Sequence, residues 1–263
     1  MIKTVLTIAG SDSCCGAGVQ ADIKAINASG AYGVCAITAL TAQNSQGVDS
    51  VLEVGGGFVG CQIDSLANDF DIAAVKTGML VNSDVVMNVV CRVERFGFDL
   101  LVVDPVIISK NGKQLLSDDG VKVLCGGLFP LAFLVTPNIP EAEMIVRGKI
   151  NNLDDMKSAA RTLIKLGPKN VLIKGGHLDS SIKSGGMAID LLFDGSSFRI
   201  FKKRFLENKI VHGTGCVLSA VITAELAKGS DIVNAVHMAK EFIFNSMDSA
   251  VYLGKGAALI NGV

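Results

Sequence analysis

The sequence predicts an α/β protein with a mostly parallel central sheet and helices on both faces, folded as a single domain over residues 1–263. Two observations carry this prediction. Short runs rich in β-branched residues alternate with longer segments of helical periodicity, which is the order of parallel strands joined by crossover helices. Most of the short runs are apolar throughout, as in strands that are covered on both faces.

The expected strands come at regular intervals along the chain. They are Thr4–Ala9, Val34–Ala39, Ile72–Lys76, Leu100–Val103, Phe133–Thr136 and Val171–Lys174. A different pattern follows them: Ala188–Phe193 and Phe198–Lys202 flank Asp194-Gly195, which predicts an antiparallel β-hairpin. Because the glycine-rich segment at Gly213 comes soon afterwards, the hairpin is interpreted either as a small flap beside a nucleotide site or as a plain edge hairpin.

The helix expected from Asp154 to Lys165 has the clearest period. Counting from Met156, apolar residues fall at i, i+3, i+4, i+7 and i+8, so that one stripe is buried. Acidic residues occupy its first turn, and Gly167-Pro168 ends it. The other expected helices show the same features less sharply and are Val19–Ala28, Ser83–Phe96, Cys216–Ala227 and Ile232–Ser249.

The composition allows a large core and excludes some partners. Apolar residues make up 49% of the 263 residues and charged residues 19%, which excludes global disorder. Lys and Arg number 24 against 25 Asp and Glu, so there is no general attraction to nucleic acid or to an anionic membrane. An anionic ligand must therefore be held by a local site.

The seven cysteines do not form a recognisable framework. Their number is odd, they are scattered, and no C-x-x-C pair occurs, which argues against structural disulfides and against a zinc site. The apolar stretch at the start is too short for a signal peptide, and no apolar run approaches the roughly 18 residues of a membrane span. We therefore expect a cytoplasmic protein with reduced thiols.

The most informative segment is His212-Gly213-Thr214-Gly215-Cys216, which leads directly into an apolar helix. Converging amides and the positive helix end predict an anion hole for phosphate, although the segment is not a Walker loop. A structural tight turn is the alternative. A thiol in the first turn has its pKa lowered, which makes Cys216 a candidate catalytic group with His212 as a neighbouring base. A buried, unreactive cysteine is the alternative there.

A second candidate lies in Thr136-Pro137-Asn138-Ile139-Pro140-Glu141, after an expected strand. Ligands of parallel sheets bind at the carboxyl ends of strands, so Asn138 and Glu141 are placed to hold hydrated Mg²⁺ beside phosphates. The alternative is helix capping, with Asn138 as N-cap and Glu141 completing a capping box.

Two further strand ends carry charged residues. Asp104 follows Val102-Val103 and is a candidate to face the metal and the phosphates, or it begins a turn. Lys174 precedes Gly175-Gly176 at the end of another strand, where a lysine suits a polyphosphate. A surface lysine is the alternative interpretation.

The segment from Gly10 to Gly18 follows the first strand and precedes a helix that carries Asp22. It lacks the spacing of a dinucleotide fingerprint and is interpreted as one wall of a small-molecule pocket. Gln43 offers both a donor and an acceptor, which match the edge of an aminopyrimidine.

Taken in order, these motifs resemble those of the phosphomethylpyrimidine kinases, the hydroxymethylpyrimidine kinase branch of the ribokinase-like family. The motifs are A-G-S-D-S-x-x-G-A-G-x-Q-A-D, T-A-Q-N-S, V-K-T-G-M-L, V-V-D-P-V, T-P-N-x-P-E-A-E, K-G-G-H and H-G-T-G-C. The resemblance implies a three-layer sandwich and transfer of the γ-phosphoryl group of ATP, with Mg²⁺, to 4-amino-5-hydroxymethyl-2-methylpyrimidine. A second transfer at the same site then makes the diphosphate, for thiamin synthesis.

The resemblance also assigns roles to individual residues. The positions matching the pyrimidine pocket are Gly10, Ala17, Asp22, Gln43, Met79 and Val106. The positions matching catalytic groups are Cys216, Lys174, Gly213, Thr214 and Gly215. The positions matching the nucleotide and its metal are Lys174, Thr214, Asn138, Glu141 and Lys240. The resemblance further implies a homodimer.

Some positions depart from the family pattern, and they keep rival functions open. Cys14-Cys15 stand where small residues are usual, and Cys216 stands where the wider family of sugar kinases has an aspartate. A pyridoxal kinase on the same scaffold is the nearest rival. A catalytically inactive protein that senses the pyrimidine is a rival of another class, against which the intact phosphate motifs argue.

Overall fold

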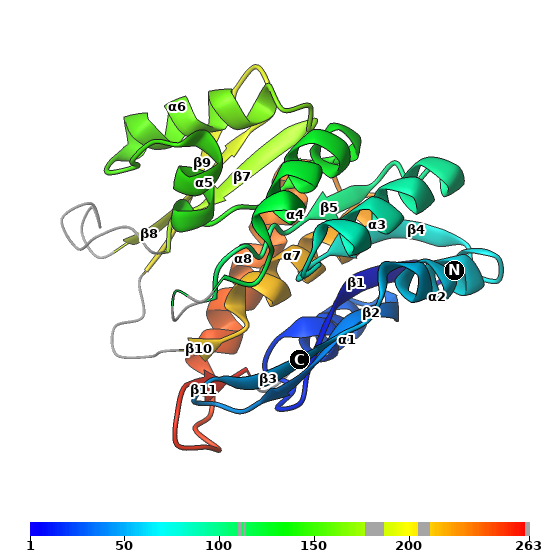
Figure 1. Ribbon diagram of the computed structural model, residues 1–263. Coiled ribbons are helices and arrows are strands. Elements are labelled where there is room, and N and C mark those ends of the chain that lie inside the picture. Colours follow the sequence, from blue (N-terminus) through cyan, green and yellow to red (C-terminus); the bar gives the residue numbers. More distant parts are fainter. Residues whose placement is uncertain (110–111, 113, 177–186, 205–210, 261–263) are drawn as a thin grey trace.

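The computed structural model describes residues 1–109, 112, 114–176, 187–204 and 211–260. A sheet of nine strands in the order β3-β2-β1-β4-β5-β6-β7-β8-β9 forms the middle of the molecule (Figure 1). The strands from β2 to β7 run parallel, and the antiparallel strands β3, β8 and β9 lie toward its two edges. The predicted mixed but mostly parallel sheet is therefore confirmed.

The strands of this sheet are β1 (Thr4–Asp12), β2 (Tyr32–Gln43), β3 (Val48–Glu53), β4 (Ile72–Thr77), β5 (Leu101–Val103), β6 (Leu134–Val135), β7 (Asn170–Lys174), β8 (Met187–Phe193) and β9 (Phe198–Arg204). A small second sheet pairs β10 (Val211–His212) with β11 (Ala258–Leu259) in parallel. The α-helices are α1 (Gly18–Ala28), α2 (Gly56–Ala67), α3 (Ser83–Phe96), α4 (Asp118–Val123), α5 (Ile139–Val146), α6 (Leu153–Ile164), α7 (Thr214–Ala227) and α8 (Ile232–Asp248).

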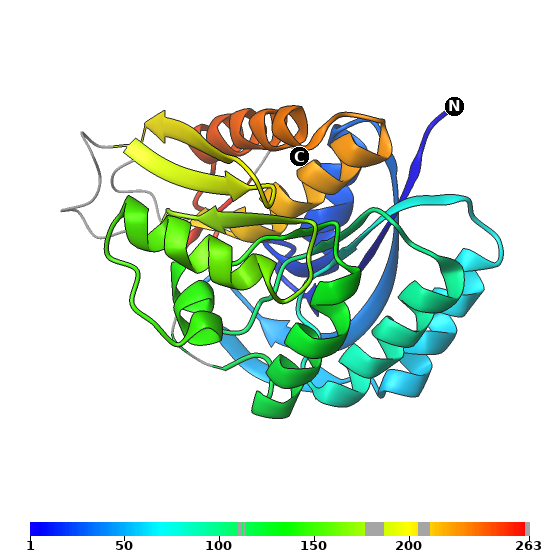
Figure 2. The same cartoon turned by 90° about the horizontal axis from the view of Figure 1, so that it is seen from above.

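Helices cover both faces of the sheet, which gives three layers (Figure 2). One core packs α2, α3, α5 and α6 against side chains such as Leu6 and Val103. The other core packs α1, α7 and α8 against alternate side chains of the same strands, such as Val5 and Val102. Alternation of side chains along a strand thus serves two cores, which explains the continuous apolar runs of the sequence.

The hairpin predicted near residue 190 exists, but it is not a separate flap. Strand β8 pairs with β7 and β9 pairs with β8, so the hairpin extends the main sheet at its edge. Its turn spans Asp194–Ser197, closed by a hydrogen bond from the Asp194 amide to the Ser197 carbonyl. The edge interpretation was therefore the correct one, because β7 has a free side that β8 can pair with.

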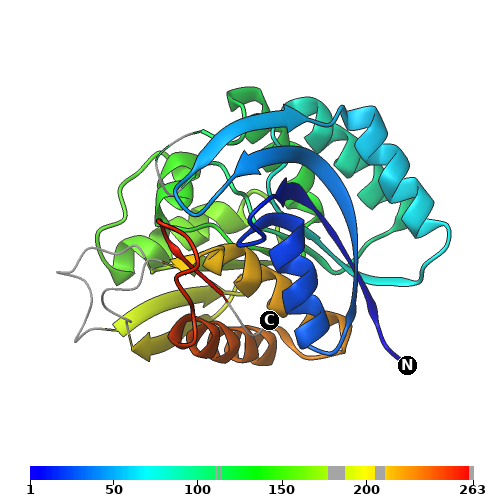
Figure 3. The same cartoon turned by 90° about the horizontal axis from the view of Figure 1, so that it is seen from below.

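A second antiparallel hairpin, absent from the sequence prediction, is formed by β2 and β3. Figure 3 shows both strands as long curved ribbons at the other edge of the sheet. Strand β2 continues to Gln43, well beyond the predicted end at Ala39, because Leu40–Gln43 pair with β3. This hairpin carries Gln43 toward the site described below.

The chain end returns to this hairpin. The Ala257 amide donates to the Ser45 carbonyl, and the Gly256 amide donates to Ser45 Oγ at 3.1 Å. Strand β11 then pairs with β10, directly before the glycine-rich segment at Gly213. Among the described residues, no helix is long and apolar enough to cross a membrane. His177 and residues 205–210 of the polar stretch before Gly213 lie outside the described residues.

Candidate active site

The polar strand ends that the sequence singles out lie side by side. The Asp104 amide donates to the Thr77 carbonyl of β4, and the Thr136 amide donates to the Val103 carbonyl of β5. The Lys174 amide likewise donates to the Pro137 carbonyl. These bonds continue the parallel ladder for one step past the strands, so residues from four separate motifs share one edge of the sheet.

Asp104 and Lys174 form a buried ion pair at this edge. Lys174 Nζ lies 2.7 Å from Asp104 Oδ1, and the two side chains are only 12% and 3% exposed. Thr136 Oγ1 donates to Asp104 Oδ1 at 3.1 Å, and Ser219 Oγ donates to Asp104 Oδ2 at 3.3 Å. Asp104 is therefore a carboxylate that holds Lys174 in place, rather than the start of a turn, and Lys174 is not a surface lysine.

The start of α7 faces Lys174. Gly213, the N-cap of α7, has φ +79, and a Cβ there would lie 1.8 Å from the Gly16 carbonyl oxygen, so only glycine fits. A Cβ on Gly215 would lie 3.3 Å from Lys174 Nζ. The first amides of a helix lack partners within the helix and carry a partial positive charge. An ammonium group and a helix N-terminus thus converge on one space, as the anion-hole prediction requires.

Asn138 and Glu141 form a complete capping box at the start of α5. The Glu141 amide donates to Asn138 Oδ1, and the Asn138 amide donates to Glu141 Oε2, each at 2.9 Å. Glu141 Oε1 also accepts from the Ile107 amide at 3.3 Å. Burial raises the pKa of Glu141 to about 7; Lys174 opposes this shift and the Asp104 charge adds to it. The capping alternative is therefore confirmed, while the same carboxyl group remains in the field of the ion pair.

The predicted acidity of Cys216 is wrong. Burial raises the pKa of the Cys216 thiol above its ordinary value, although the Lys76 ammonium and a hydrogen bond from the Gly18 amide favour the thiolate. The nearby carboxylates of Asp22 and Asp104 raise it further. The position at a helix start, which the sequence shows, is thus outweighed by desolvation and by two negative charges that only the folded chain brings near.

Lys76 is the residue that sequence reasoning missed. It has no solvent exposure, and its Nζ lies 2.7 Å from Asp22 Oδ2, which also accepts from Thr7 Oγ1 at 2.6 Å. Within the described part of the chain, Asp22 Oδ1 has no hydrogen-bond partner. Asp22, expected in the pyrimidine pocket, is thus fully buried and holds Lys76 in the field of Cys216. The sequence feature that could have identified Lys76 is its charge near the end of an otherwise apolar strand.

The other residues matched to the pyrimidine pocket line the neighbouring loops. A Cβ on Gly10 would lie 2.4 Å from Met79 Cε, so the glycine makes room for that methionine. The Ala17 amide donates to Asp12 Oδ2 at 2.8 Å, which fixes the loop before α1. Val106 has φ +44, a strained conformation for a β-branched residue. Strain of this kind is found at sites where the surrounding structure imposes a geometry.

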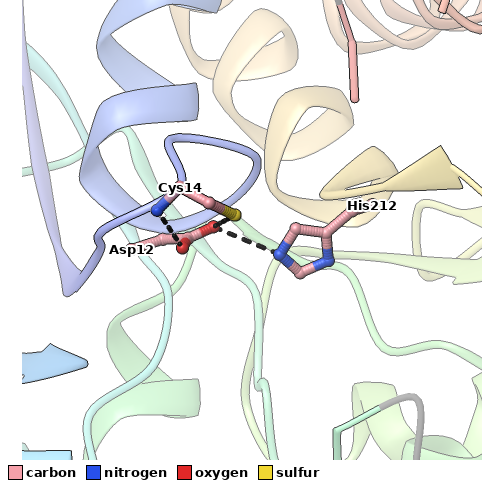
Figure 4. A group of neighbouring side chains, drawn as sticks. All are labelled: Asp12, Cys14 and His212. Carbon is pink, nitrogen blue, oxygen red and sulfur yellow. Dashed lines mark hydrogen bonds and ion pairs between the residues drawn. The ribbon is translucent and has the colours of Figure 1, made fainter. Parts of the chain in front are cut away.

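Gln43 reaches the start of α7 through His212. Gln43 Nε2 lies 2.7 Å from His212 Nε2, and the same ring nitrogen lies 3.1 Å from Asp12 Oδ2 (Figure 4). Because His212 directly precedes Gly213, the candidate pyrimidine-binding amide and the candidate anion hole are neighbours. Both described partners of His212 Nε2, Gln43 and Asp12, lie away from Cys216, so the prediction of His212 as a base acting on Cys216 is not supported.

Lys240 lies at a different place from the other phosphate-binding candidates. Its ammonium group, on α8, forms an ion pair with Asp190 on β8. Asp190 Oδ1 in turn accepts from the Gly175 amide at 2.9 Å, next to Lys174. Lys240 also borders a hollow of about 200 Å³ between β9 and α8. Among the residues that the structure describes, Asp190 is the connection between Lys240 and the site.

A parallel sheet whose carboxyl edge presents a buried lysine and carboxylates to a glycine-preceded helix defines the class of ribokinase-like small-molecule kinases. The comparisons with known proteins then give the family. A family model described as phosphomethylpyrimidine kinase matches residues 12–261. The chain belongs to the phosphomethylpyrimidine kinase family.

Curated relatives agree with this assignment. The hydroxymethylpyrimidine/phosphomethylpyrimidine kinase of Bacillus subtilis is 43% identical over 255 residues, which cover 97% of this chain and 93% of that protein. The thiamine biosynthesis bifunctional protein ThiED of Geobacter sulfurreducens is 42% identical over 260 residues. The match covers 99% of this chain but only 52% of that protein, so the chain spans about half of the bifunctional relative.

Solved structures of two related activities share the fold. The phosphomethylpyrimidine kinase of Clostridium difficile superposes with a TM-score of 0.82 at 42% identity, over 93% of this chain and 99% of that chain. The pyridoxal kinase of Staphylococcus aureus in complex with AMP-PCP and pyridoxal has a TM-score of 0.88 at 30% identity, over 99% of this chain and 93% of that chain.

Proposed function

We propose that this protein phosphorylates 4-amino-5-hydroxymethyl-2-methylpyrimidine with ATP and then phosphorylates the monophosphate to the diphosphate. The observation that carries the proposal is the approach of Lys174 Nζ to the first turn of α7, where a Cβ on Gly215 would be only 3.3 Å away. Two sources of positive potential meet there. A migrating phosphoryl group gathers negative charge on its outer oxygens, which such a pair stabilises.

The chain's own residues supply positioning and electrostatics. Asp104 holds the Lys174 ammonium at 2.7 Å, so the lysine is aimed before any ligand arrives. Gly213 lets the backbone turn so that the amides of Thr214, Gly215 and Cys216 open toward the anion. The free energy needed to orient these groups is therefore spent when the chain folds, not during the reaction.

We propose that Cys216 assists the first transfer as its thiolate. Burial raises the pKa of the thiol, so the thiolate is the minor form near neutral pH, and the Lys76 ammonium is the nearby charge that favours it. In the first transfer, an alcohol oxygen attacks and must lose a proton. In the second transfer, a phosphate oxygen is already anionic, so no base is required there.

Mg²⁺ fits the acidic side of this site. Asp104 and Glu141 are two buried carboxyl groups in the field of Lys174, and Asp104 also interacts with Lys76. Hard oxygen ligands of this kind suit Mg²⁺, which keeps several of its waters. We propose that Asp104, Asn138 and Glu141 hold the ion through water. The bound ion would neutralise part of the triphosphate charge.

We propose that the pyrimidine is recognised beside this anion hole by Gln43, with Gly10, Ala17, Met79 and Val106 around it. The Gln43 amide offers a donor and an acceptor that complement an aminopyrimidine edge. It is only one hydrogen bond, through His212, from the segment that begins α7. Asp22 contributes to this pocket by holding Lys76 in place, not by touching the pyrimidine itself.

The activity is tested by measuring ATP turnover with the hydroxymethylpyrimidine, its monophosphate and pyridoxal in parallel. We expect turnover of both pyrimidines and at least about tenfold lower kcat/KM for pyridoxal, which corresponds to about 1.4 kcal/mol of discrimination. Preference for pyridoxal would instead identify the chain as a pyridoxal kinase, like the Staphylococcus aureus protein that shares its fold. Pyrimidine binding without ATP turnover would identify an inactive sensor.

We propose further that the protein is a cytoplasmic homodimer. All seven cysteines are free, which suits a reducing compartment. Strand β3 pairs with β2 on one side and is an edge strand of the main sheet within the described residues, and Leu52 on it is 65% exposed. Exposed apolar edge strands are surfaces on which a second copy can pair. Sedimentation equilibrium of the protein and of a Leu52→Lys variant tests this, with a weakened dimer expected for the variant.

A further inference from the structure

A cluster of three potential metal ligands lies beside the candidate pyrimidine site. Asp12 ends β1, Cys14 follows in the loop before α1, and His212 ends β10 (Figure 4). One oxygen atom, Asp12 Oδ2, lies 3.5 Å from Cys14 Sγ and 3.1 Å from His212 Nε2. A thiol and an imidazole, which are both ligands of soft divalent cations when deprotonated, therefore converge on one carboxylate oxygen.

We propose that Asp12, Cys14 and His212 form a binding site for a thiophilic divalent cation of the Zn²⁺ type. Tetrahedral zinc with ordinary bond lengths separates an oxygen and a nitrogen ligand by about 3.3 Å, and an oxygen and a sulfur ligand by about 3.5 Å. The observed separations are 3.1 Å and 3.5 Å, and the three ligand atoms all lie within 4.8 Å of one another. The two separations from Asp12 Oδ2 therefore match those of tetrahedral zinc.

The loop holds Asp12 firmly enough to act as the anchor of the site. Asp12 Oδ2 accepts from the amides of Gly16 at 3.1 Å and Ala17 at 2.8 Å, and Oδ1 accepts from the Cys14 amide at 3.0 Å. The Asp12 carboxylate is therefore fixed by three backbone amides.

The cation would replace the hydrogen-bond contacts of the cluster. In the metal-free protein, Cys14 Sγ lies 3.5 Å and His212 Nε2 lies 3.1 Å from Asp12 Oδ2. On binding, the thiol proton is released to solvent and a metal–sulfur bond forms in its place, while the neutral imidazole binds through Nε2 with its one proton on Nδ1. The charge of the ion balances the thiolate and the carboxylate.

Gln43 offers the fourth ligand. In the metal-free protein, Gln43 Nε2 lies 2.7 Å from His212 Nε2, and Thr41 Oγ1 donates to Gln43 Oε1 at 3.2 Å. Half a turn of the Gln43 amide would bring its oxygen beside the three other ligand atoms. A cation bound here joins the loop before α1 to the segment that begins α7, and it engages the residue proposed to bind the pyrimidine.

The sequence rule against zinc missed this site because it considers only ligands that are neighbours along the chain. Asp12 and His212 are separated by 200 residues. The loop of β1 and the short strand β10 bring them together because Gly213 packs directly against Gly16.

Titration of the reduced protein with Co²⁺, a spectroscopic substitute for Zn²⁺, tests the proposal. We expect one Co²⁺ per chain, with a thiolate-to-cobalt charge-transfer band in the ultraviolet and the visible bands of tetrahedral cobalt. Cys14→Ser should abolish the charge-transfer band and weaken binding at least about tenfold. Cys15→Ser is the matched control, because Cys15 is the exposed neighbour outside the cluster and should leave both unchanged.

Two outcomes would overturn the proposal. One is a charge-transfer band that survives in Cys14→Ser but disappears in Cys216→Ser, which would place the ion at the phosphate end of the site. The other is equal Co²⁺ affinity of the protein and Cys14→Ser. Thermal unfolding of Cys14→Ser without metal shows whether the variant is folded, and Cys14→Ala offers a second replacement that lacks an oxygen ligand.

A kinetic consequence rests on the proposed function. Zn²⁺ should raise KM for the pyrimidine in the unmodified protein and in Cys15→Ser, but not in Cys14→Ser, because the ion competes for Gln43. If the protein has no kinase activity, the cobalt spectra still decide whether the site exists. If the kinase is active but Zn²⁺ raises KM equally in all three proteins, the inhibitory ion is bound elsewhere.

Discussion

At the scale of single residues, the site depends on charges that have been removed from water. Lys76 and Asp22 are both fully buried, and Lys174 and Asp104 are nearly so. A buried charge is tolerated only when a partner compensates for the loss of hydration. Each lysine is therefore held by one carboxylate, and its field acts on the neighbouring Cys216 from a constant position.

The role of Cys216 is testable through the two phosphorylation steps. Cys216→Ala should lower kcat for the hydroxymethylpyrimidine by about 10²-fold, the lower end of general base catalysis, and kcat for the monophosphate much less. The reason is that only the alcohol must lose a proton. Steady-state kinetics with each substrate measures this, and equal losses in both steps would show that the thiol is only a pocket wall.

The buried pair of Asp22 and Lys76 has a predictable effect on stability. Asp22→Asn leaves an uncompensated ammonium group in the core, so the free energy of unfolding should fall by about 3–5 kcal/mol. The double variant Asp22→Asn with Lys76→Met has no charge left to compensate and should recover a large part of that loss. Urea denaturation of the two variants and the parent gives the values. A double variant that is no more stable than Asp22→Asn would contradict the assignment.

At the scale of elements, the start of α7 is the part whose geometry matters most. The helix is buried along nearly its whole length, so its direction is set by the core that it shares with α1 and α8. Its N-terminus is placed by Gly213, which touches the loop before α1. Packing of a whole helix thus determines where a few backbone amides point.

Alanine substitutions at the glycines at the two ends of α7 distinguish the effect of a strained backbone conformation from that of a steric clash. Both glycines have a positive φ, +79 at Gly213 and +96 at Gly229. A Cβ on Gly213 would lie 1.8 Å from the Gly16 carbonyl oxygen, whereas a Cβ on Gly229 would have no described atom within 4 Å. Gly229→Ala should cost about 1–2 kcal/mol of unfolding free energy, the price of the left-handed conformation. Gly213→Ala should cost clearly more.

The same pair of variants distinguishes stability from catalysis. Gly213→Ala should also lower kcat, because the amides move away from the phosphoryl group, whereas Gly229→Ala should leave kcat unchanged. Thermal unfolding and ATP turnover are measured on the same samples. Similar effects of both variants on kcat would show that the position of the α7 amides does not control the reaction.

At the scale of the whole molecule, Glu141 makes stability depend on pH. Its pKa is about 7 in the folded protein against an ordinary value of 4.5. The folded state therefore binds more protons than the unfolded state between these values. The contribution of Glu141 to the free energy of unfolding is fully present below pH 4.5 and is lost as pH rises to about 7. The total loss is about 3 kcal/mol.

Two variants on α5 should show opposite trends. The stability advantage of the parent over Glu141→Gln should shrink as pH rises from 5 to 8. Glu143 is the control: hydrogen bonds from the Ile150 amide and Lys149 outweigh burial and lower its pKa. The stabilisation by the Glu143 carboxylate is present above the pKa of the unfolded chain and is lost as pH falls. Glu143→Gln should therefore lower the free energy of unfolding most at neutral pH. Urea denaturation at several pH values measures both, and parallel trends would contradict the shift of Glu141.

Helix α2 and strand β3 were not predicted from the sequence, and each has an identifiable reason. Helix α2 begins with Gly56-Gly57 and contains Gly60, which lowers its intrinsic helix propensity. A Cβ on Gly60 would lie 2.4 Å from the guanidinium carbon of Arg92, so the glycine permits close packing on α3. Strand β3 was missed because its residues are mostly exposed and show no buried face.

The order of strands and helices, the glycine-rich start of α7 and the polar strand ends follow from local preferences, because apolar period, capping and turn chemistry act over a few residues. The sequence alone therefore sufficed for the α/β class and for Lys174, Asn138, Glu141 and the segment Gly213–Cys216 as chemical candidates. Charge states, the pairing of Lys76 with Asp22, and the meeting of Asp12, Cys14 and His212 were decided only in three dimensions. Desolvation and Coulomb interactions depend on distances in space, and those distances are unrelated to separation along the chain.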